Sequence, residues 1–200
     1  MKGHYIVVEG IDGSGKTSIC SKISTSLIQR GYKILQISEP SHSEIGLLLR
    51  NQMKNLHINQ TSLALLYAAD SYDIQERIKD HYDFIISDRN YLSTVAYQMI
   101  DVDKEWLLML HRFLKQPDMV FYLNVTVEAA MERIKSRNNN IDFFETSESL
   151  LKIKSNYEKL ISDELGLKVF CIDTVGKSQS MVAQDVMGII QEQFFIKEEV

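Results

Sequence analysis

The stretch Y-I-V-V-E-G-I-D-G-S-G-K-T, at residues 5–17, decides the fold of this chain. Its first four residues have the β-branched and aromatic side chains that favour a buried strand. Residues 10–17 match the pattern G-x-x-x-x-G-K-[S/T], and apolar residues at helical spacing follow them. A strand before this pattern and a helix after it are the context that a P-loop requires, so the stretch predicts one.

The residue types in this loop suit a polyphosphate. Glycines let successive backbone N–H groups turn inward around a phosphate, and the following helix adds the positive end of its dipole. Lys16 can reach the β- and γ-phosphates, and the Thr17 hydroxyl can bind Mg²⁺. The alternative, a glycine-rich turn, is disfavoured because all four signature positions are filled. The residues expected around the phosphates of ATP are Gly10, Ile11, Asp12, Gly13, Ser14, Gly15, Lys16 and Thr17.

Length and charge limit the class of protein. Two hundred residues suit one domain, 1–200, and a net charge of −5 argues against a broad nucleic-acid or anionic-membrane surface. No apolar run approaches the roughly 18 residues of a membrane span. Cys20 and Cys171 lack the spacing of metal ligands and are expected to be buried free thiols. We therefore expect a cytoplasmic protein without membrane or nucleic-acid partners.

Strand and helix patterns alternate along the chain. We expect strands at residues 5–8, 32–38, 83–88, 119–125 and 167–172. Helices are expected at residues 17–29, 45–54, 61–79, 103–115, 127–136, 147–163 and 178–195. This alternation predicts a three-layer α/β fold, in which a five-stranded parallel sheet has helices on both faces. Ligands of such sheets bind beyond the carboxyl ends of the strands.

Polar residues stand at those strand ends. Glu9 follows the first strand, Glu39-Pro40 the second and Asp88-Arg89 the third. An aspartate at the end of an apolar strand is where a P-loop protein places the carboxylate that holds Mg²⁺. We therefore expect Thr17 and Asp88 to form the metal site. An ion pair between Asp88 and Arg89 that only caps the strand is the alternative.

Motifs along almost the whole chain resemble the thymidylate kinases, a family of P-loop nucleoside monophosphate kinases. They are E-G-I-D-G-S-G-K-T at 9–17, E-P at 39–40, L-R at 49–50, L-A-L-L-Y-A-A-D at 63–70, D-R at 88–89, S-T-V-A-Y-Q at 93–98, P-D at 117–118 and D-F-F-E at 142–145. The resemblance implies a P-loop NTPase fold with a mobile lid, here at about residues 137–146. It also implies a Mg²⁺-dependent transfer of the γ-phosphoryl group of ATP to dTMP, and a homodimer.

The same resemblance implies an acceptor site. Arg50 and Arg89 match the arginines that hold the 5′-phosphate of the acceptor, and guanidinium groups suit that task. Asp12 is similar to the carboxylate that meets the 3′-hydroxyl of the sugar. Tyr97 resembles the aromatic residue under the deoxyribose, and Tyr67 the one that stacks on the base. The other expected acceptor residues are Glu39, Pro40, Asp70, Ser71, Ser93, Thr94 and Gln98.

Two arginines at the edge of the predicted lid are candidates for catalysis. Arg133 and Arg137 are four residues apart, so they share one face of a helix. Arginines that a closing lid brings in can neutralise the charge that develops during phosphoryl transfer. Because residues 11–14 of the loop include no arginine, we expect the lid to supply it. The catalytic candidates are Lys16, Asp12, Arg89, Arg137 and Arg133, and the alternative for the last two is a solvated helix face.

Three positions depart from the family pattern. Ser71 stands where an arginine usually contacts the base, Asn90 replaces an aromatic residue, and Ser38 stands where arginine is frequent. These changes leave open a kinase for another pyrimidine nucleoside monophosphate or for a deoxynucleoside. Arg50 and Arg89 argue against the deoxynucleoside, which has no phosphate. A nucleotide-dependent switch or binding protein is the alternative from another class, although the chain lacks the N-K-x-D motif for guanine.

Overall fold

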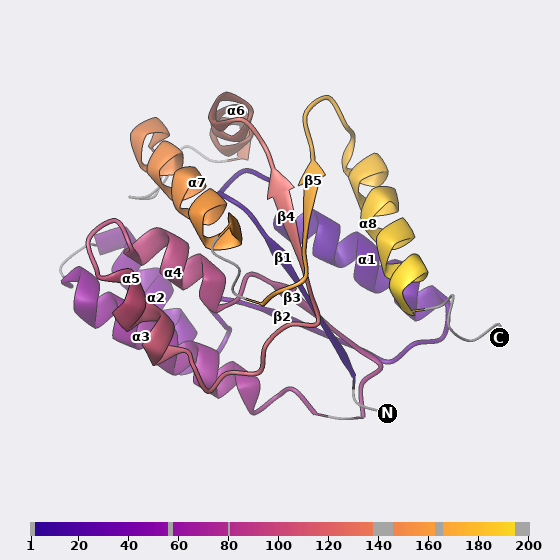
Figure 1. Cartoon of the computed structure of the whole chain (residues 1–200), viewed down its shortest axis with the longest axis horizontal. Helices are drawn as coiled ribbons and strands as arrows, with labels where there is room; N and C mark the ends of the chain where they lie inside the picture. The colour runs from indigo at the N-terminus through magenta and orange to yellow at the C-terminus, as the bar shows by residue number, and fades with distance from the viewer. Residues whose placement is uncertain (1–2, 56–57, 80, 138–145, 163–165, 195–200) are drawn as a thin grey trace.

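The computed structural model describes residues 3–55, 58–79, 81–137, 146–162 and 166–194. Its centre is a five-stranded sheet in the order β2-β3-β1-β4-β5, and every neighbouring pair is parallel (Figure 1). The strands are β1 (His4–Glu9), β2 (Ile34–Ser38), β3 (Phe84–Asp88), β4 (Met119–Asn124) and β5 (Val169–Asp173). The parallel five-stranded sheet expected from the sequence is therefore confirmed.

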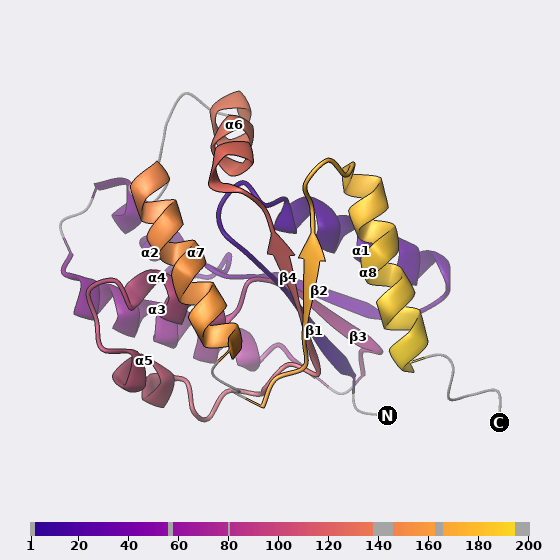
Figure 2. The same cartoon turned by 45° about the horizontal axis from the view of Figure 1, so that its top comes forward.

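Helices cover both faces of the sheet. They are α1 (Lys16–Gln29), α2 (Glu44–Asn55), α3 (Gln60–Gln75), α4 (Tyr91–Gln98), α5 (Lys104–Leu110), α6 (Val127–Arg137), α7 (Ser147–Ser162) and α8 (Gln179–Phe194). In Figure 1, α1 and α8 lie on one side, and α3, α4 and α7 lie on the other. Helix α6 stands beyond the carboxyl end of β4 (Figure 2).

The alternation of side chains along β1 explains the two cores. Tyr5 and Val7 belong to the core under α4 and α7, whereas Ile6 and Val8 belong to the core under α1 and α8. All four side chains are buried because successive residues of a strand point to opposite faces, and here both faces are covered. The nearly continuous apolar sequence of this strand follows from that position.

Helix α4 was not predicted from the sequence. All its residues except Tyr97 are buried, so no polar face gives it a helical period. Its start is nevertheless marked, because the Asn90 side chain accepts a hydrogen bond from the Leu92 N–H. The helix predicted at residues 103–115 was too long, since α5 ends at Leu110 and turns follow it. These differences change the connections between strands and leave the sheet as predicted.

The two cysteines differ in exposure. Cys20 is buried in α1, as expected, but Cys171 is exposed, and the prediction for Cys171 was wrong. Its strand, β5, is an edge strand whose outer side has no neighbour in the sheet. None of the helices in the described residues is long and apolar enough to cross a membrane. The cytoplasmic location stays a prediction.

Candidate active site

The P-loop connects β1 to α1 at the carboxyl edge of the sheet. Its glycines Gly10, Gly13 and Gly15 all have positive φ angles, which L-residues rarely adopt. A Cβ atom on Gly13 would also lie 2.4 Å from the Ala130 carbonyl oxygen in α6, so only glycine fits between the loop and that helix. The loop therefore has the backbone conformation that its sequence pattern predicts.

Lys16 bends back over the P-loop. Its Nζ donates a hydrogen bond to the Ile11 carbonyl at 2.9 Å, and the side chain is buried. Burial and the nearby Arg89 lower the pKa of this amine to about 8, although Asp12 and Asp88 oppose that shift. The negative charge of a bound polyphosphate would stabilise the protonated form of this buried amine.

Thr17 and Asp88 form a small oxygen-rich site beside the loop. The Thr17 hydroxyl donates a 2.5 Å hydrogen bond to Asp88 Oδ2 across α1 and β3. Within the described part of the chain, no three His, Cys, Asp or Glu side chains gather as metal ligands. One carboxylate and one hydroxyl suit Mg²⁺, which keeps several waters and uses phosphate oxygens as further ligands. These two residues fit the ion that we expected there.

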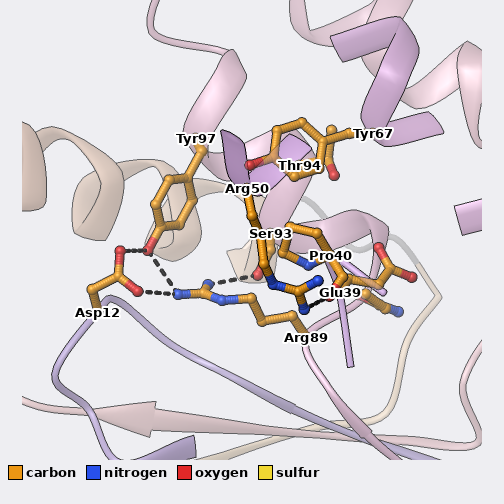
Figure 3. A pocket seen from close by; sticks show the side chains of 10 residues that line it. Asp12, Glu39, Pro40, Arg50, Tyr67, Arg89, Ser93, Thr94 and Tyr97 are labelled. Atoms are coloured by element: carbon orange, nitrogen blue, oxygen red, sulfur yellow. Dashed lines mark hydrogen bonds and ion pairs between the residues drawn. The ribbon is translucent and has the colours of Figure 1, made fainter. Parts of the chain in front are cut away.

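Two cavities meet at this edge of the sheet. One, of about 540 Å³, lies over the P-loop and includes Lys16, Thr17 and Asp88 in its wall. The other, of about 320 Å³, lies beside it (Figure 3). Its lining residues are Asp12, Glu39, Pro40, Arg50, Tyr67, Arg89, Asn90, Ser93, Thr94 and Tyr97. We call the first the loop cavity and the second the side cavity. Both are lined by Asp12, Glu39, Pro40, Arg50 and Arg89.

Arg89 is the most connected side chain of the side cavity. Its Nη2 donates to Asp12 Oδ1 at 2.5 Å and to the Tyr97 hydroxyl at 3.0 Å. Its Nη1 donates to Ser93 Oγ at 2.8 Å. The residue has a φ of 73°, a strained conformation for a residue with a side chain. The strain is tolerated because these contacts fix the side chain, and it aims the guanidinium along the wall between the two cavities.

Asp12 and Tyr97 complete this contact. The Tyr97 hydroxyl donates to Asp12 Oδ2 at 2.9 Å, so each oxygen of the carboxylate has a partner (Figure 3). Burial alone would raise the pKa of Asp12, but Arg89 and Lys16 outweigh it and hold that pKa below its usual range. The carboxylate is therefore charged at neutral pH and able to accept a hydrogen bond from a ligand hydroxyl.

Glu9 is a buried acid whose role sequence reasoning missed. It accepts hydrogen bonds from the Ser93 hydroxyl at 2.7 Å, the Tyr157 hydroxyl at 2.8 Å and the Asn90 N–H at 2.9 Å. Burial raises its pKa, and Arg89 opposes that shift. Its position at the end of β1 was visible in the sequence, but its contact with Tyr157, from α7, spans 148 residues. Glu9 thus holds the groups that contact Arg89.

Arg50 enters the side cavity from α2. Its two terminal nitrogens donate to the Pro40 and Ser41 carbonyls. In Figure 3 the Arg50 and Arg89 guanidinium groups lie near each other, and Tyr67 and Thr94 lie farther along the cavity. The cavity therefore has a cationic part with Arg50 and Arg89, beside which the Tyr97 ring lies, and another part with the Tyr67 ring.

Three residues expected in the acceptor site lie outside this lining. Asp70 accepts from Ser41, and Ser71 donates to Glu39 Oε2 at 2.8 Å. Gln98 is buried and absent from the walls of both cavities. Asp70 and Ser71 were expected in the acceptor site with Tyr67, but of these three residues only Tyr67 lines the side cavity. Spacing along a helix indicates a shared face, but the loop after β2 covers the part with Asp70 and Ser71.

Arg133 lies over the loop cavity. Its Nη1 donates to the Gly13 carbonyl at 3.2 Å, so α6 contacts the P-loop through both Ala130 and Arg133. The Arg137 side chain and residues 138–145 lie outside the described residues, so the lid at about 137–146 stays a prediction.

A smaller cavity, of about 150 Å³, continues from the P-loop toward the loop between β5 and α8. Its polar lining includes Thr174, Lys177 and Gln179, which sequence reasoning did not single out. Their signal was the rule that ligands bind at carboxyl ends of parallel strands, because these residues follow the end of β5.

Glu39 gives a prediction about stability. Burial raises its pKa to about 8 from 4.5; the Ser71 hydrogen bond opposes the shift, and Glu9 and Asp70 add to it. The folded state therefore favours the neutral acid. The contribution of neutral Glu39 to the unfolding free energy is fully present below pH 4.5, the pKa expected in the unfolded chain, and is lost as the pH rises toward 8. Between pH 5 and pH 9, wild type should lose about 2–4 kcal/mol more unfolding free energy than Glu39→Gln.

Urea unfolding of both proteins at the two pH values measures this difference. Glu132→Gln, in the exposed face of α6, is the matched control and should follow wild type. Equal losses in wild type and Glu39→Gln would show that Glu39 is charged in the folded protein at both pH values.

A P-loop with its lysine, threonine and strand-end aspartate, on a parallel sheet, defines the class of P-loop nucleotide-binding proteins. The family model described as Thymidylate kinase matches residues 8–185. The chain belongs to the thymidylate kinase family.

Curated relatives agree with that family. A probable thymidylate kinase of Methanobrevibacter smithii is 36% identical over 163 residues, which cover 80% of this chain and 81% of the relative. The thymidylate kinase of Brachyspira hyodysenteriae is 33% identical over 199 residues, covering 96% and 95%. The solved thymidylate kinase from Candida albicans has a TM-score of 0.80 over 96% of this chain and 92% of that one; at 23% identity, that similarity concerns the fold.

Proposed function

We propose that this protein transfers the γ-phosphoryl group of ATP to dTMP, giving dTDP and ADP. Membership of the thymidylate kinase family supports this reaction. The observation that carries it is that the loop cavity and the side cavity share lining residues, among them two arginines and an aspartate. A donor triphosphate in the first cavity and an acceptor phosphate in the second would meet at these shared residues.

On the donor side, the P-loop N–H groups and Lys16 hold the β- and γ-phosphates. Thr17 and Asp88 would hold Mg²⁺, which neutralises charge on the phosphates. The adenosine end would extend toward the cavity lined by Thr174 and Lys177. Arg133, already beside the loop, is placed to stabilise charge on the transferred group.

On the acceptor side, Arg50 and Arg89 bind the 5′-phosphate of dTMP. Asp12, charged and partly exposed, accepts a hydrogen bond from the 3′-hydroxyl, and the Tyr97 ring packs under the deoxyribose. Tyr67 stacks on the base, with Ser93 and Thr94 at the wall of the same cavity. Catalysis then consists of placing the attacking phosphate oxygen in line with the γ-phosphorus and stabilising the charge that develops.

An acceptor panel tests the reaction. ADP release, measured by a coupled assay with dTMP, dUMP, UMP, dCMP, CMP, AMP and GMP, should be fastest with dTMP and slow without any acceptor. A preference for another pyrimidine monophosphate would support the alternative that Ser71 leaves open. ATP turnover that is independent of every acceptor would contradict a kinase and favour a nucleotide-dependent switch.

We also propose a homodimer, as the family resemblance implies. Three exposed leucines support an apolar contact: Leu47 and Leu48 in α2 and Leu65 in α3. In light scattering after gel filtration, wild type should have twice the mass of one chain, and Leu47→Glu together with Leu65→Glu should give the single-chain mass. Leu151→Glu, at an exposed leucine of α7, is the control and should stay dimeric. A wild-type monomer would contradict the proposal.

A further inference from the structure

Asp70, in α3, is a buried carboxylate outside the lining of both cavities. Its Oδ2 accepts the Ser41 N–H at 2.7 Å, and its Oδ1 accepts the Ser41 hydroxyl at 2.5 Å and the Ser43 hydroxyl at 3.3 Å. No ion pair to Asp70 is found among the described residues. The loop after β2 therefore supplies the hydrogen bonds that compensate the burial of this group.

The peptide group between Pro40 and Ser41 is held at both ends. Its N–H donates to the Asp70 carboxylate, and its carbonyl oxygen accepts from Arg50 Nη2. A negative group thus contacts the positive end of the peptide dipole, and a positive group contacts the negative end. Hydrogen bonds arranged in this order strengthen one another, and rotation of the peptide would break both. The next carbonyl, that of Ser41, accepts from Arg50 Nη1.

The same loop packs tightly on the start of α2, the helix that carries Arg50. A Cβ atom on Gly46 would lie 2.0 Å from the Ser41 carbonyl oxygen, so only glycine allows this approach. Ser43 contacts α2 as well, because its hydroxyl accepts the Gly46 N–H and its carbonyl accepts the Leu47 N–H. The loop and the first turn of α2 therefore form one unit, which Asp70 ties to α3.

We propose that Asp70 is a positioning residue for the acceptor site: it fixes the Pro40–Ser41 peptide and thereby aims the Arg50 guanidinium at the acceptor phosphate. This inference rests on the proposed function, since Arg50 is taken to bind that phosphate. A guanidinium has five N–H donors, and two nitrogens that each use one donor on a carbonyl leave the others for a ligand. Without these ties, Arg50 would lose side-chain entropy when the acceptor binds, and the affinity would fall.

Asp70→Asn tests the inference. The Ser41 N–H and hydroxyl now donate to different oxygens of Asp70, and in asparagine one of these acceptors becomes an NH2 donor, so one of the two hydrogen bonds is lost in the present geometry. The KM for dTMP should rise about 10-fold, with kcat within about 3-fold and a smaller rise in the KM for ATP, since Arg50 also lines the loop cavity. Asp73→Asn is the matched control, because Asp73 lies one turn later in α3, is partly exposed and pairs with Arg77. Equal rises in both KM values, or a fall in kcat alone, would overturn the inference.

A double-mutant cycle separates positioning from general support of the fold. Asp70→Asn should weaken dTMP binding about 10-fold in wild type but less than about 2-fold in Arg50→Ala, because no guanidinium is then left to aim. Equal factors in the two backgrounds would overturn the inference. If Asp70→Asn does not fold, Ser41→Ala replaces it in the same cycle. This variant removes one of the two hydrogen bonds from Ser41 to Asp70. The expected effect on dTMP binding is about 2- to 5-fold, which corresponds to about half the free energy of a hydrogen bond to a charged group.

Failure of the proposed function would look different. Wild type would then show no turnover that depends on dTMP, and the cycle would use whichever monophosphate the acceptor panel identifies, since all carry a 5′-phosphate. Normal wild-type turnover, with Asp70→Asn indistinguishable from Asp73→Asn, would overturn only the role of Asp70.

Discussion

Arg89→Ala should lower kcat/KM for dTMP by about 30- to 1,000-fold, since a charge-assisted contact in a site shielded from water contributes roughly 2–4 kcal/mol. The guanidinium lines both cavities and is fixed by Asp12, Ser93 and Tyr97. Its loss would remove positive charge from the wall against which the acceptor phosphate is proposed to bind. The coupled ADP-release assay, with dTMP and ATP varied separately, measures the effect.

Two further variants make this result specific. Arg89→Lys keeps the charge without the planar fork and should recover only part of the activity. Arg112→Ala removes an arginine that lies over the Phe113 ring away from the cavities, and it should behave as wild type. Near wild-type activity in Arg89→Ala would contradict the assignment of this residue to the acceptor phosphate.

Lys16→Ala should lower kcat by two to three orders of magnitude, because it removes the cation that we propose contacts the transferred phosphoryl group (about 3–4 kcal/mol). The lysine is already bent over the P-loop, and burial with Arg89 lowers its pKa to about 8. Calorimetry with ADP separates lost binding from lost catalysis. Lys22→Ala is the matched control on α1, since that exposed amine contacts Ser180. Activity within about 3-fold of wild type in Lys16→Ala would contradict a P-loop phosphotransferase.

Local patterns predicted the sheet and the P-loop well. The strand at residues 5–8 and the glycines at 10, 13 and 15 are short-range signals, and both lie where expected. Helix α4 was not predicted because nearly every residue in it is buried, so its sequence has no polar face. The exposure of Cys171 was not predicted because it depends on the position of β5 at the edge of the sheet, and strand order is a property of the whole sheet.

The site was harder to predict than the fold. Arg50 and Arg89 were assigned from family resemblance, and no pattern in the sequence shows that they share a cavity. Glu9 meets Tyr157 across 148 residues, and Asp70 meets Ser41 across 29. Such contacts depend on how loops fold over the ends of the strands. Tyr67, Asp70 and Ser71 were all expected in the acceptor site, but Asp70 and Ser71 are hydrogen-bonded to the segment after β2 and do not line the side cavity.

Ser71 donates a hydrogen bond to Glu39 and does not line the side cavity, and this changes which residues are candidates for contact with the base. A serine there does not act directly on a ligand of that cavity. Its partner Glu39 does line the cavity, and its raised pKa of about 8 makes it a neutral acid at pH 7. Such a group both donates and accepts hydrogen bonds. Glu39 therefore offers a ligand of the side cavity both a donor and an acceptor, whereas Ser71 is not in the lining of that cavity.

The wall shared by the loop and side cavities has a thermodynamic consequence. Arg50 and Arg89 line both cavities, so in the proposed reaction the phosphates of ATP and dTMP would share the same positive charges, and the binding of one would be coupled to the binding of the other. Linkage requires that whatever factor ATP imposes on the affinity for dTMP, dTMP imposes on the affinity for ATP. Saturating the protein with one nucleotide thus changes the dissociation constant of the other. A single molecule that carries both sets of phosphates would bind in one step, so its affinity would not depend on the concentration of a second nucleotide.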